Sequence, residues 1–292
     1  MPVLRRRFDA MKRRRSSGNT WAIRVSLLLA VLLCAAAGNA QNIDAAWKEL
    51  MVQGQHAALS RDYLRAEEAY QKALKEAERF GAGDSRVAAT LRSLGSVYRA
   101  TRRSADAAGV YNRALAILDK GDVEENADFA DLNFSLASVL MEQGNPSAAL
   151  PLLARSLSVF SKQSGGDSLQ VAAVHCMTGD AYRALRNWGE AEISLKRCAE
   201  LREADGGVVN DGLGDALYSL ALVYQKEGKY GLADPRFKLA EKIREVTQGI
   251  MSSGFADVLE SHAAMLRSMG RDREAAQDAA LAAAVRRHQP KK

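Results

Sequence analysis

The side chains of this chain that could bind a metal ion or act as nucleophiles are few and scattered. The histidines are His56, His175, His262 and His288, and the cysteines are Cys34, Cys176 and Cys198. His175 and Cys176 are neighbours, but successive residues of a helix point about 100° apart and make a poor pair of metal ligands. The chain also lacks the spaced motifs of a phosphate-binding loop, a serine nucleophile elbow, a zinc protease and a C-x-x-C redox site. We therefore expect no catalytic residues, no metal and no cofactor.

Groups that could bind a partner recur at a fixed spacing instead of forming one cluster. Serines stand at multiples of 42 residues from one another, at Ser93, Ser135, Ser219 and Ser261. The residues just before this series repeat with the same spacing and are Arg92, Phe134, Cys176, Tyr218 and Glu260. A fixed period indicates that each member comes from the same place in a repeated structural unit.

The clearest copy of that unit is Leu217–Arg244, LYSLALVYQKEGKYGLADPRFKLAEKIR. Its first half has large or small apolar residues at spacings of three and four, and its second half repeats this pattern after a turn at Gly228. Residues three and four apart share one face of a helix, so each half predicts an amphipathic helix. Ala221 and Ala233 are small where the two helices must approach, and Phe237 is large where space must be filled.

Five further copies surround this one. The alanines equivalent to Ala233 are Ala66, Ala107, Ala149, Ala191 and Ala275, separated by one step of 41 residues and otherwise by steps of 42. The repeats span about 44–83, 84–126, 127–168, 169–210, 211–252 and 253–288, within an array over residues 41–288 and before a polar tail at 289–292. We expect one continuous domain, because each repeat of such an array packs only on its neighbours.

The spacing L-x2-L-A-x2-Y followed by A-x3-F resembles the tetratricopeptide repeat (TPR) family. The 42-residue period and the connectors GAGDSRVAAT (81–90) and SGGDSLQVAAV (164–174) are similar to kinesin light chain arrays, although both connectors lack the His-Pro of that form. The resemblance implies an all-α, right-handed TPR solenoid of about six helix–turn–helix repeats. It also implies that the first helix of each repeat lines a concave groove that binds a protein or peptide.

The resemblance places the recurring residues in that groove. The predicted partner-binding residues are Arg92, Phe134, Ser135, Cys176, Arg183, Tyr218, Ser219 and Glu260. Kinesin light chain arrays carry asparagine where this chain has serines, which leaves open whether the serines hold a peptide backbone. Tyr218 follows the packing residue Leu217 and is expected to turn away from the packing face. The alternative is that Phe134 and Tyr218 fill gaps between neighbouring first helices, and that Arg183 is a solvated surface residue.

Cys176 and Cys198 are the only cysteines after residue 40. An oxidising compartment would permit a disulfide between them. Cys198, however, occupies a position that is alanine in most other repeats, where a free cysteine serves as a small buried apolar residue. We therefore expect two free thiols.

Residues 1–40 have the composition of a secretory signal peptide. Eight basic residues against one acidic residue accompany the apolar run VSLLLAVLLCAAA, and Gly38 and Ala40 are small residues before Gln41. The run is shorter than the roughly 20 apolar residues of a membrane anchor. Arg5 and Arg6 leave twin-arginine export open beside the general secretory route. We expect cleavage before Gln41, a periplasmic or secreted protein, and no stable membrane span after cleavage.

The leader also accounts for the basic character of the chain. The whole sequence has 41 basic and 35 acidic residues, and without the leader 33 and 34 remain. The balanced charge of the array does not favour nucleic acid as a partner.

These patterns favour a non-catalytic, exported protein–protein interaction scaffold. The first alternative is a structural protein that self-associates through its alanine-rich last helix, Ala275–Val285, which no seventh repeat covers. The second is an enzyme with an unrecognised site in the groove, for which the sequence offers no acid–base pair.

Overall fold

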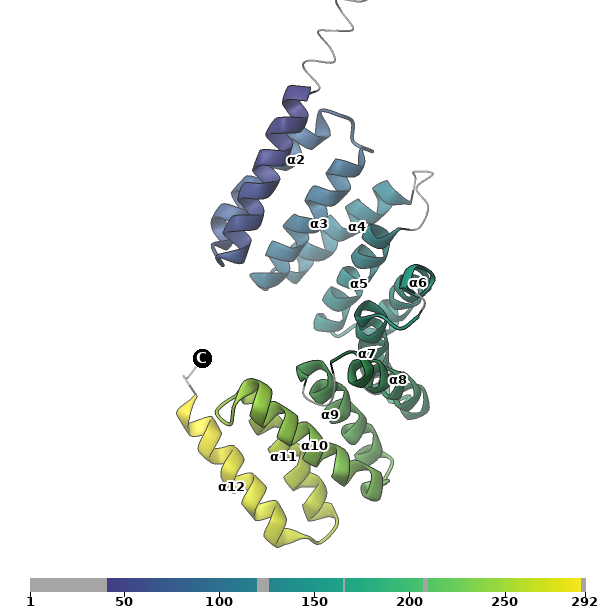
Figure 1. The fold of residues 1–292 in the computed structure, drawn as a ribbon, viewed down its shortest axis with the longest axis vertical. Coiled ribbons are helices and arrows are strands. Elements are labelled where there is room, and N and C mark those ends of the chain that lie inside the picture. The colour runs from purple at the N-terminus through teal and green to yellow at the C-terminus, as the bar shows by residue number, and fades with distance from the viewer. Residues whose placement is uncertain (1–40, 120–125, 165, 207–209, 290–292) are drawn as a thin grey trace, which may run out of the picture. The chain divides into compact units, whose positions relative to one another are not determined.

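The computed structural model describes residues 41–119, 126–164, 166–206 and 210–289. Within these ranges the protein is all-α, with twelve helices and no strands, which confirms the predicted repeat solenoid (Figure 1). The predicted signal peptide lies outside the described residues, as does most of the tail. In the described part of the chain, no helix has both the length and the apolar character required to cross a membrane.

Along the chain the helices follow one another as six pairs, each joined by a short turn. The first pair consists of residues 41–59 and α2 (Tyr63–Glu78). The following pairs are α3 (Ser85–Ala100) with α4 (Ser104–Leu118), α5 (Ala127–Glu142) with α6 (Pro146–Ser164), α7 (Leu169–Ala184) with α8 (Trp188–Gly206), α9 (Asp211–Lys226) with α10 (Tyr230–Gln248), and α11 (Ser253–Ser268) with α12 (Asp272–His288). We refer to the two helices of each pair as the first and the second helix of a hairpin.

Side-chain caps fix where the first helices begin. Asn126, Ser168, Asn210 and Ser252 are spaced by 42 residues, and each side-chain oxygen accepts a hydrogen bond from the backbone N–H three residues later. Such a cap satisfies one of the N–H groups that a helix leaves unpaired at its start. The period of the sequence is therefore also a period of helix starts.

The turn inside each hairpin contains one residue in the left-handed conformation. Gly144, Gly228 and Gly270 have φ of 74°, and Arg61, Arg102 and Arg186 occupy the same place in the other hairpins with φ of 59–61°. Glycine adopts this conformation without a steric cost, whereas a residue with a Cβ does not. The backbone path is thus kept in all six hairpins, although only three have the residue type that suits it.

Small residues let the helices approach and large ones fill the remaining space. The six reference alanines from Ala66 to Ala275 are all fully buried. Tyr111, Tyr224 and Phe237 are the bulkiest of the fully buried side chains. The alternation of small and large residues along the repeat therefore marks the core, as the pattern predicts.

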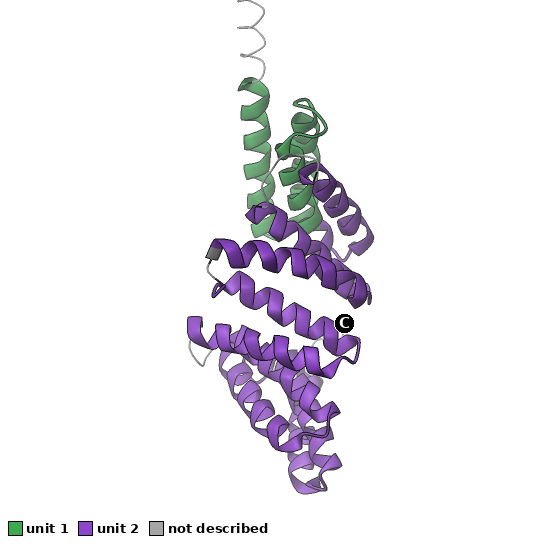
Figure 2. Ribbon diagram, turned by 90° about the vertical axis from the view of Figure 1, so that its right-hand side faces the viewer, with its two compact units in different colours: residues 1–97 green, residues 98–292 purple. Residues whose placement is uncertain are grey.

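The contacts divide the chain into two compact units, residues 1–97 and 98–292 (Figure 2). In unit 1 the indole of Trp47 donates a hydrogen bond to Thr90 Oγ1 at 2.9 Å, and Arg86 pairs with Asp44 at 3.0 Å. In unit 2 the consecutive first helices α5, α7, α9 and α11 contact one another directly, whereas consecutive second helices lie farther apart. The first helices therefore line the inner side of unit 2, and we call this surface the first-helix face.

Candidate functional site

The predicted partner-binding residues all come from first helices. Arg92 lies on α3 in unit 1 and is half-buried. The remaining seven belong to unit 2, where Phe134 and Ser135 lie on α5, Cys176 and Arg183 on α7, Tyr218 and Ser219 on α9, and Glu260 on α11. Phe134 and Ser135 are half-buried, Ser219 is buried and Glu260 is exposed. The structure therefore places these residues on neighbouring first helices but gives them different access to solvent.

Tyr218 lies between helices instead of projecting away from them. Its ring meets the edge of the Phe237 ring with centroids 6.2 Å apart, and the guanidinium of Arg244 lies 4.8 Å from its ring centre. Its hydroxyl is 2.9 Å from Ser261 Oγ on α11. The expectation that Tyr218 turns away from the packing face is wrong. The structure agrees with the alternative in which this side chain fills a gap beside the next first helix.

The recurring serines of α9 and α11 also link neighbouring first helices. Ser219 donates a hydrogen bond to Asp180 Oδ1 at 2.8 Å, and Ser261 is paired with Tyr218 as described above. Asp180 accepts a second bond, at 3.1 Å, from Arg183. Both serines are therefore occupied by contacts that hold one hairpin on the next, and Arg183 is anchored on its own helix.

Glu260 forms part of an ion-pair group at the last hairpin. Arg286 on α12 donates to Glu260 at 2.9 and 3.0 Å and to Asp257 at 2.5 Å. The hydrogen bond from Arg286 lowers the pKa of Glu260 below its usual range. Glu260 is thus a paired carboxylate at the end of the first-helix face.

Cys176 is joined to Cys198 by a disulfide, so the expectation of two free thiols is wrong. The two residues face each other across the α7–α8 hairpin with their Cα atoms 5.2 Å apart, a separation typical of disulfides. The equivalent pair in the next hairpin is Tyr218 and Ala240, a large residue opposite a small one. The signal available in the sequence is that the only two cysteines after residue 40 lie one on each helix of the same hairpin.

Sequence reasoning missed a column of arginines on the second helices. Arg202 on α8, Arg244 on α10 and Arg286 on α12 are spaced by 42 residues. Arg244 pairs with Asp215 on α9 at 2.7 Å, and Arg286 pairs with Asp257 on α11. Asp215 and Asp257 are also 42 residues apart. Arg244 and Arg286 therefore extend from the second helices to carboxylates on the first helices.

The only histidine with two carboxylate neighbours in the described residues is His262, and it is buried. Its Nε2 lies 3.2 Å from Asp234 Oδ1 and its Nδ1 lies 2.9 Å from Asp278 Oδ2, while its ring is 5.4 Å from that of Phe237. Only 3% of the residue is exposed, so a substrate has no access to it. The same described part of the chain contains no group of three or more metal-ligating side chains. We interpret His262 as a polar group that joins three helices.

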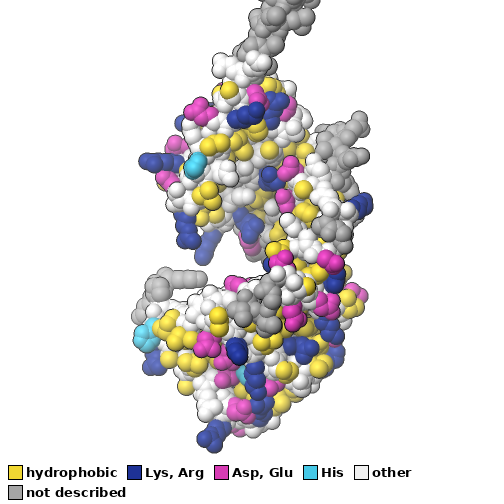
Figure 3. Space-filling view, viewed as in Figure 1, with side chains coloured by type: hydrophobic (Ala, Val, Ile, Leu, Met, Phe, Trp, Pro, Cys, Tyr) yellow, Lys and Arg dark blue, Asp and Glu magenta, His cyan; other side chains and the backbone are white. Residues whose placement is uncertain are grey.

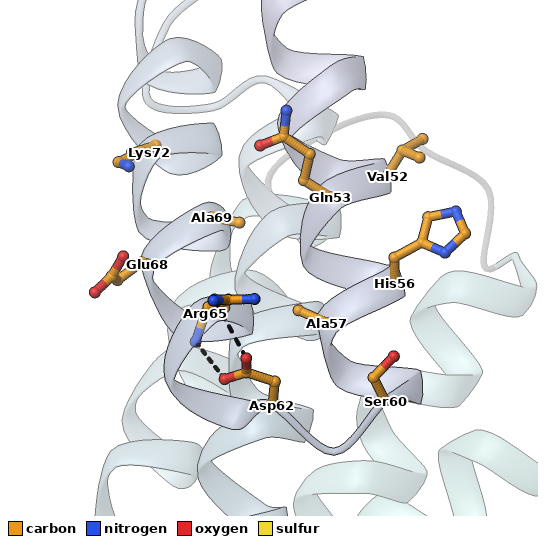
Figure 4. Close-up of a pocket in the computed structure, with 10 residues that line it drawn as sticks. All are labelled: Val52, Gln53, His56, Ala57, Ser60, Asp62, Arg65, Glu68, Ala69 and Lys72. Atoms are coloured by element: carbon orange, nitrogen blue, oxygen red, sulfur yellow. Dashed lines mark hydrogen bonds and ion pairs between the residues drawn. The ribbon is translucent and has the colours of Figure 1, made fainter.

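Unit 1 has a depression of about 570 Å³ between its first helix and α2 (Figure 4). Gln53 and Ala57 lie there at positions that hold large apolar residues in later repeats, which explains why the space is not filled. The other lining residues are Val52, His56, Ser60, Asp62, Arg65, Glu68, Ala69 and Lys72. Asp62 accepts from the backbone and lies 3.3 Å from the guanidinium of Arg65, so part of the lining is already paired.

Charges of both signs alternate over the face of the molecule shown in Figure 3. Lys and Arg side chains lie among Asp and Glu side chains there and form no large patch of one sign. This distribution is typical of solvated helix faces and gives no indication of a polyanion-binding surface.

Comparison with family models gives one match. The model of the tetratricopeptide repeat matches residues 46–120 and 128–204, which together make up slightly more than half of the chain. Comparison with curated proteins found no match.

Solved structures with the same fold are numerous. BtubC (BKLC) from P. vanneervenii has 23% sequence identity and a TM-score of 0.63, over 71% of this chain and 83% of its own. A kinesin light chain-related protein with nearly identical TPR-like repeats from Podosopora anserina has 18% identity and a TM-score of 0.58, over 69% and 95%. A Rap protein complexed with Competence and Sporulation Factor has 18% identity and a TM-score of 0.54, over 83% and 75%. At these identities the similarity establishes the fold.

Proposed function

The chain belongs to the tetratricopeptide repeat family, and we propose that it is a non-catalytic scaffold that binds a protein or peptide on the first-helix face of unit 2. The observation that carries this proposal is the direct contact among α5, α7, α9 and α11, which gives that face a continuous inner surface. A concave surface of stacked repeats is the usual binding surface of a solenoid. The Rap protein of similar fold is complexed with Competence and Sporulation Factor, which supports a peptide-sized ligand.

The side chains on this face suit a mixed contact. Phe134 is half-buried on α5 and can contribute apolar area, whereas Arg183 and Glu260 carry charges at the surface of α7 and α11. Aromatic residues and arginines are the residue types that contribute most at protein interfaces. We therefore expect a ligand segment with apolar and charged side chains in alternation.

We further propose that the protein is exported to the periplasm or the cell exterior. The leader has the composition of a signal peptide, and the Cys176–Cys198 disulfide suits an oxidising compartment. Cell fractionation with N-terminal sequencing tests this. A soluble protein that begins at Gln41 in the envelope fraction supports export, and an intact Met1 in the cytoplasmic fraction contradicts it.

Binding is tested by capture from cell-envelope extract, followed by affinity measurement with the captured protein. Phe134→Ala and Arg183→Glu change the first-helix face and should each weaken binding at least tenfold. Ile193→Ala and Lys242→Glu are matched controls at exposed positions of the second helices α8 and α10. Thermal unfolding of each variant separates lost binding from lost structure. Equal affinities for all four folded variants would contradict the proposed binding face.

A further inference from the structure

Two of the three arginines that recur on the second helices pair with a carboxylate of the same hairpin. Arg244 Nη2 donates to Asp215 Oδ1 at 2.7 Å and Nη1 donates to the carbonyl of Gly254 at 2.5 Å, and its side chain is only 8% exposed. Arg286 reaches Asp257 and Glu260 in the last hairpin. In each case the carboxylate comes from the first helix of the same hairpin, so the hairpin neutralises its own arginine.

The α7–α8 hairpin keeps the arginine and lacks the carboxylate. Arg202 is the equivalent of Arg244, and the position equivalent to Asp215 is Ala173. Among the described residues no carboxylate pairs with the Arg202 guanidinium, whereas the Nε atoms of Arg202 and Arg244 are alike in being buried without a hydrogen-bond partner. A partly buried cation without a counter-ion is unfavourable, because its desolvation is not offset by an attraction. The site therefore has a positive charge beside Ala173, where the two following hairpins have an aspartate.

Arg202 and Arg244 approach the following hairpin in the same way. Gly212 and Gly254 are 42 residues apart, and each opens the hairpin that follows its arginine. A Cβ added to Gly212 would lie 3.0 Å from Arg202 Cζ, and one added to Gly254 would lie 3.2 Å from Arg244 Nη1. Both glycines thus leave room for the guanidinium of the preceding hairpin.

The support beneath the guanidinium also differs between the two hairpins. Arg244 lies over the ring of Tyr218, whose equivalent in the α7–α8 hairpin is Cys176. Arg202 follows Cys198 by four residues on α8, and Cys198 is covalently joined to α7. The disulfide therefore fixes the part of α8 from which Arg202 extends. The position of the Tyr218 ring is taken by Cys176 in this hairpin, so no aromatic ring from that position covers the Arg202 guanidinium.

We propose that Arg202 binds a carboxylate of the ligand, in the place that Asp215 and Asp257 occupy in the two following hairpins. This inference rests on the proposed peptide-binding function and adds the chemistry of one contact. The carboxylate is that of an Asp or Glu side chain or of a peptide C-terminus. An arginine and a carboxylate form charge-assisted, often bidentate hydrogen bonds, which specify both the charge and the orientation of the bound group.

Three N-acetylated pentapeptide probes test the chemistry on the purified protein. The first has a central glutamate among alanines and an amidated C-terminus, the second has glutamine instead, and the third is all alanine with a free C-terminal carboxylate. The readout is the NMR signal of the Arg202 Nε–H group, assigned by its loss in Arg202→Gln. We expect the signal to shift with an acidic probe, with at least tenfold weaker binding of the glutamine peptide. Comparison of the first and third probes identifies the source of the carboxylate.

Variants at Ala173 supply the internal control. Ala173→Asp restores the carboxylate of the other hairpins, and should raise the melting temperature by about 2–4 °C and weaken the acidic probes at least tenfold. Ala173→Asn has nearly the same shape without the charge and should do neither, and Lys242→Gln removes a positive charge elsewhere on the second helices. Probes that leave the Arg202 signal unchanged, or that bind Ala173→Asp as well as the unmodified protein, would overturn the inference. The proposed function would survive that result if the captured partner still depended on Phe134 and Arg183.

Discussion

The α7–α8 and α9–α10 hairpins are neighbours with the same backbone plan, yet different chemistry holds each of them together. At equivalent positions, α9–α10 has Tyr218 opposite Ala240 and a fully buried Phe237, whereas α7–α8 has the Cys176–Cys198 disulfide and Leu195. Gly179 lies so close to Leu195 that a Cβ added to the glycine would be 2.5 Å from the Cγ of Leu195. The residue equivalent to Gly179 in the α9–α10 hairpin is Ala221, which has a Cβ. One hairpin therefore uses aromatic volume, and the other uses close approach with a covalent link.

This difference shows that the repeat specifies a backbone path more strictly than it specifies side chains. Packing at native density can be reached with large rings across a wider gap or with small residues across a narrower one. The same freedom applies to charge, because Arg244 is neutralised within its hairpin, whereas Arg202 has no carboxylate partner in the part of the chain that the structure describes. A repeat that does not satisfy its own groups is where an array can acquire a specific ligand.

The largest expected effect is the loss of aromatic volume from α9–α10. Phe237 is fully buried against Tyr218 and His262, so Phe237→Ala should lower the free energy of unfolding by about 3–5 kcal/mol. Leu281→Ala is the control, since Leu281 is 43% exposed and its truncation should change stability by less than about 0.5 kcal/mol. Urea unfolding followed by circular dichroism measures both. A cost below about 1 kcal/mol for Phe237→Ala would show that this hairpin does not depend on its ring.

The next effect is the loss of the covalent link from α7–α8. The disulfide closes 22 residues of chain, for which the loop-entropy model predicts roughly 3 kcal/mol of stabilisation. The double variant Cys176→Ala and Cys198→Ala should be destabilised by about this amount, and reductant should destabilise the unmodified protein but not the variant. Thiol counting in denaturant without reductant should find no free thiol among the two. Two free thiols in the exported protein would contradict the link.

Much of this architecture can be predicted from spacing alone. Positions such as Ala191 and Ala233 recur with the repeat because they face the partner helix of the same hairpin, and a helix of known pitch determines which residues do so. The capping residues Asn126, Ser168, Asn210 and Ser252 could have been found in the same way, since they have the right types immediately before each first helix.

The contacts on the flank of each first helix could not be predicted in this way. Tyr218 lies one residue beyond the packing position of Leu217, and a single helix viewed alone places it toward solvent. In the array the next first helix covers that flank, so the ring is packed and its hydroxyl meets Ser261. The same holds for Cys176 and for Arg202, because the angle between helices decides what they meet. The spacing of residues along one helix does not determine the angle between neighbouring helices.

Acid should weaken both hairpins, because each has a paired carboxylate at the equivalent position of its second helix. Burial raises the pKa of Asp234, but hydrogen bonds from Lys238, His262 and Arg271 outweigh it and lower that pKa to about 2. On α8, the equivalent Glu192 has its pKa lowered to about 2, mainly by Lys196 and further by Lys229 and Tyr224. A carboxyl whose folded pKa is depressed stabilises the fold above its unfolded pKa of about 4, and this contribution is lost as the pH falls toward about 2.

Asp234→Asn in α9–α10 and Glu192→Gln in α7–α8 test whether these carboxylates stabilise their hairpins in a pH-dependent way. Each variant should lose about 1–3 kcal/mol of stability near pH 7, and the loss should become small near pH 2, where about half of the unmodified carboxyl is itself protonated. Unfolding curves at pH 7, 4 and 2 give the three differences. Lys242→Gln, at an exposed position of α10, controls for a general change in charge. A difference that stays constant with pH in either variant would show that its carboxylate is not stabilised in the fold.

The smallest effect should come from the turns that begin the second helices. Arg186 in the α7–α8 turn has φ of 59°, and Gly228 at the same place in the α9–α10 turn has φ of 74°. The left-handed conformation costs a residue with a Cβ roughly 1–2 kcal/mol. Replacing that residue with glycine removes this cost, but glycine has more conformational entropy in the unfolded chain, which offsets part of the stabilisation. Arg186→Gly should therefore stabilise by about 0.5 kcal/mol, whereas Gly228→Ala should destabilise by about 1 kcal/mol. Arg186→Ala separates backbone from side chain, since it removes the exposed guanidinium without relieving φ, and should leave stability nearly unchanged. If Arg186→Ala stabilises the protein as much as Arg186→Gly does, then the Arg186 side chain, and not its left-handed backbone conformation, causes the difference in stability between the two turns.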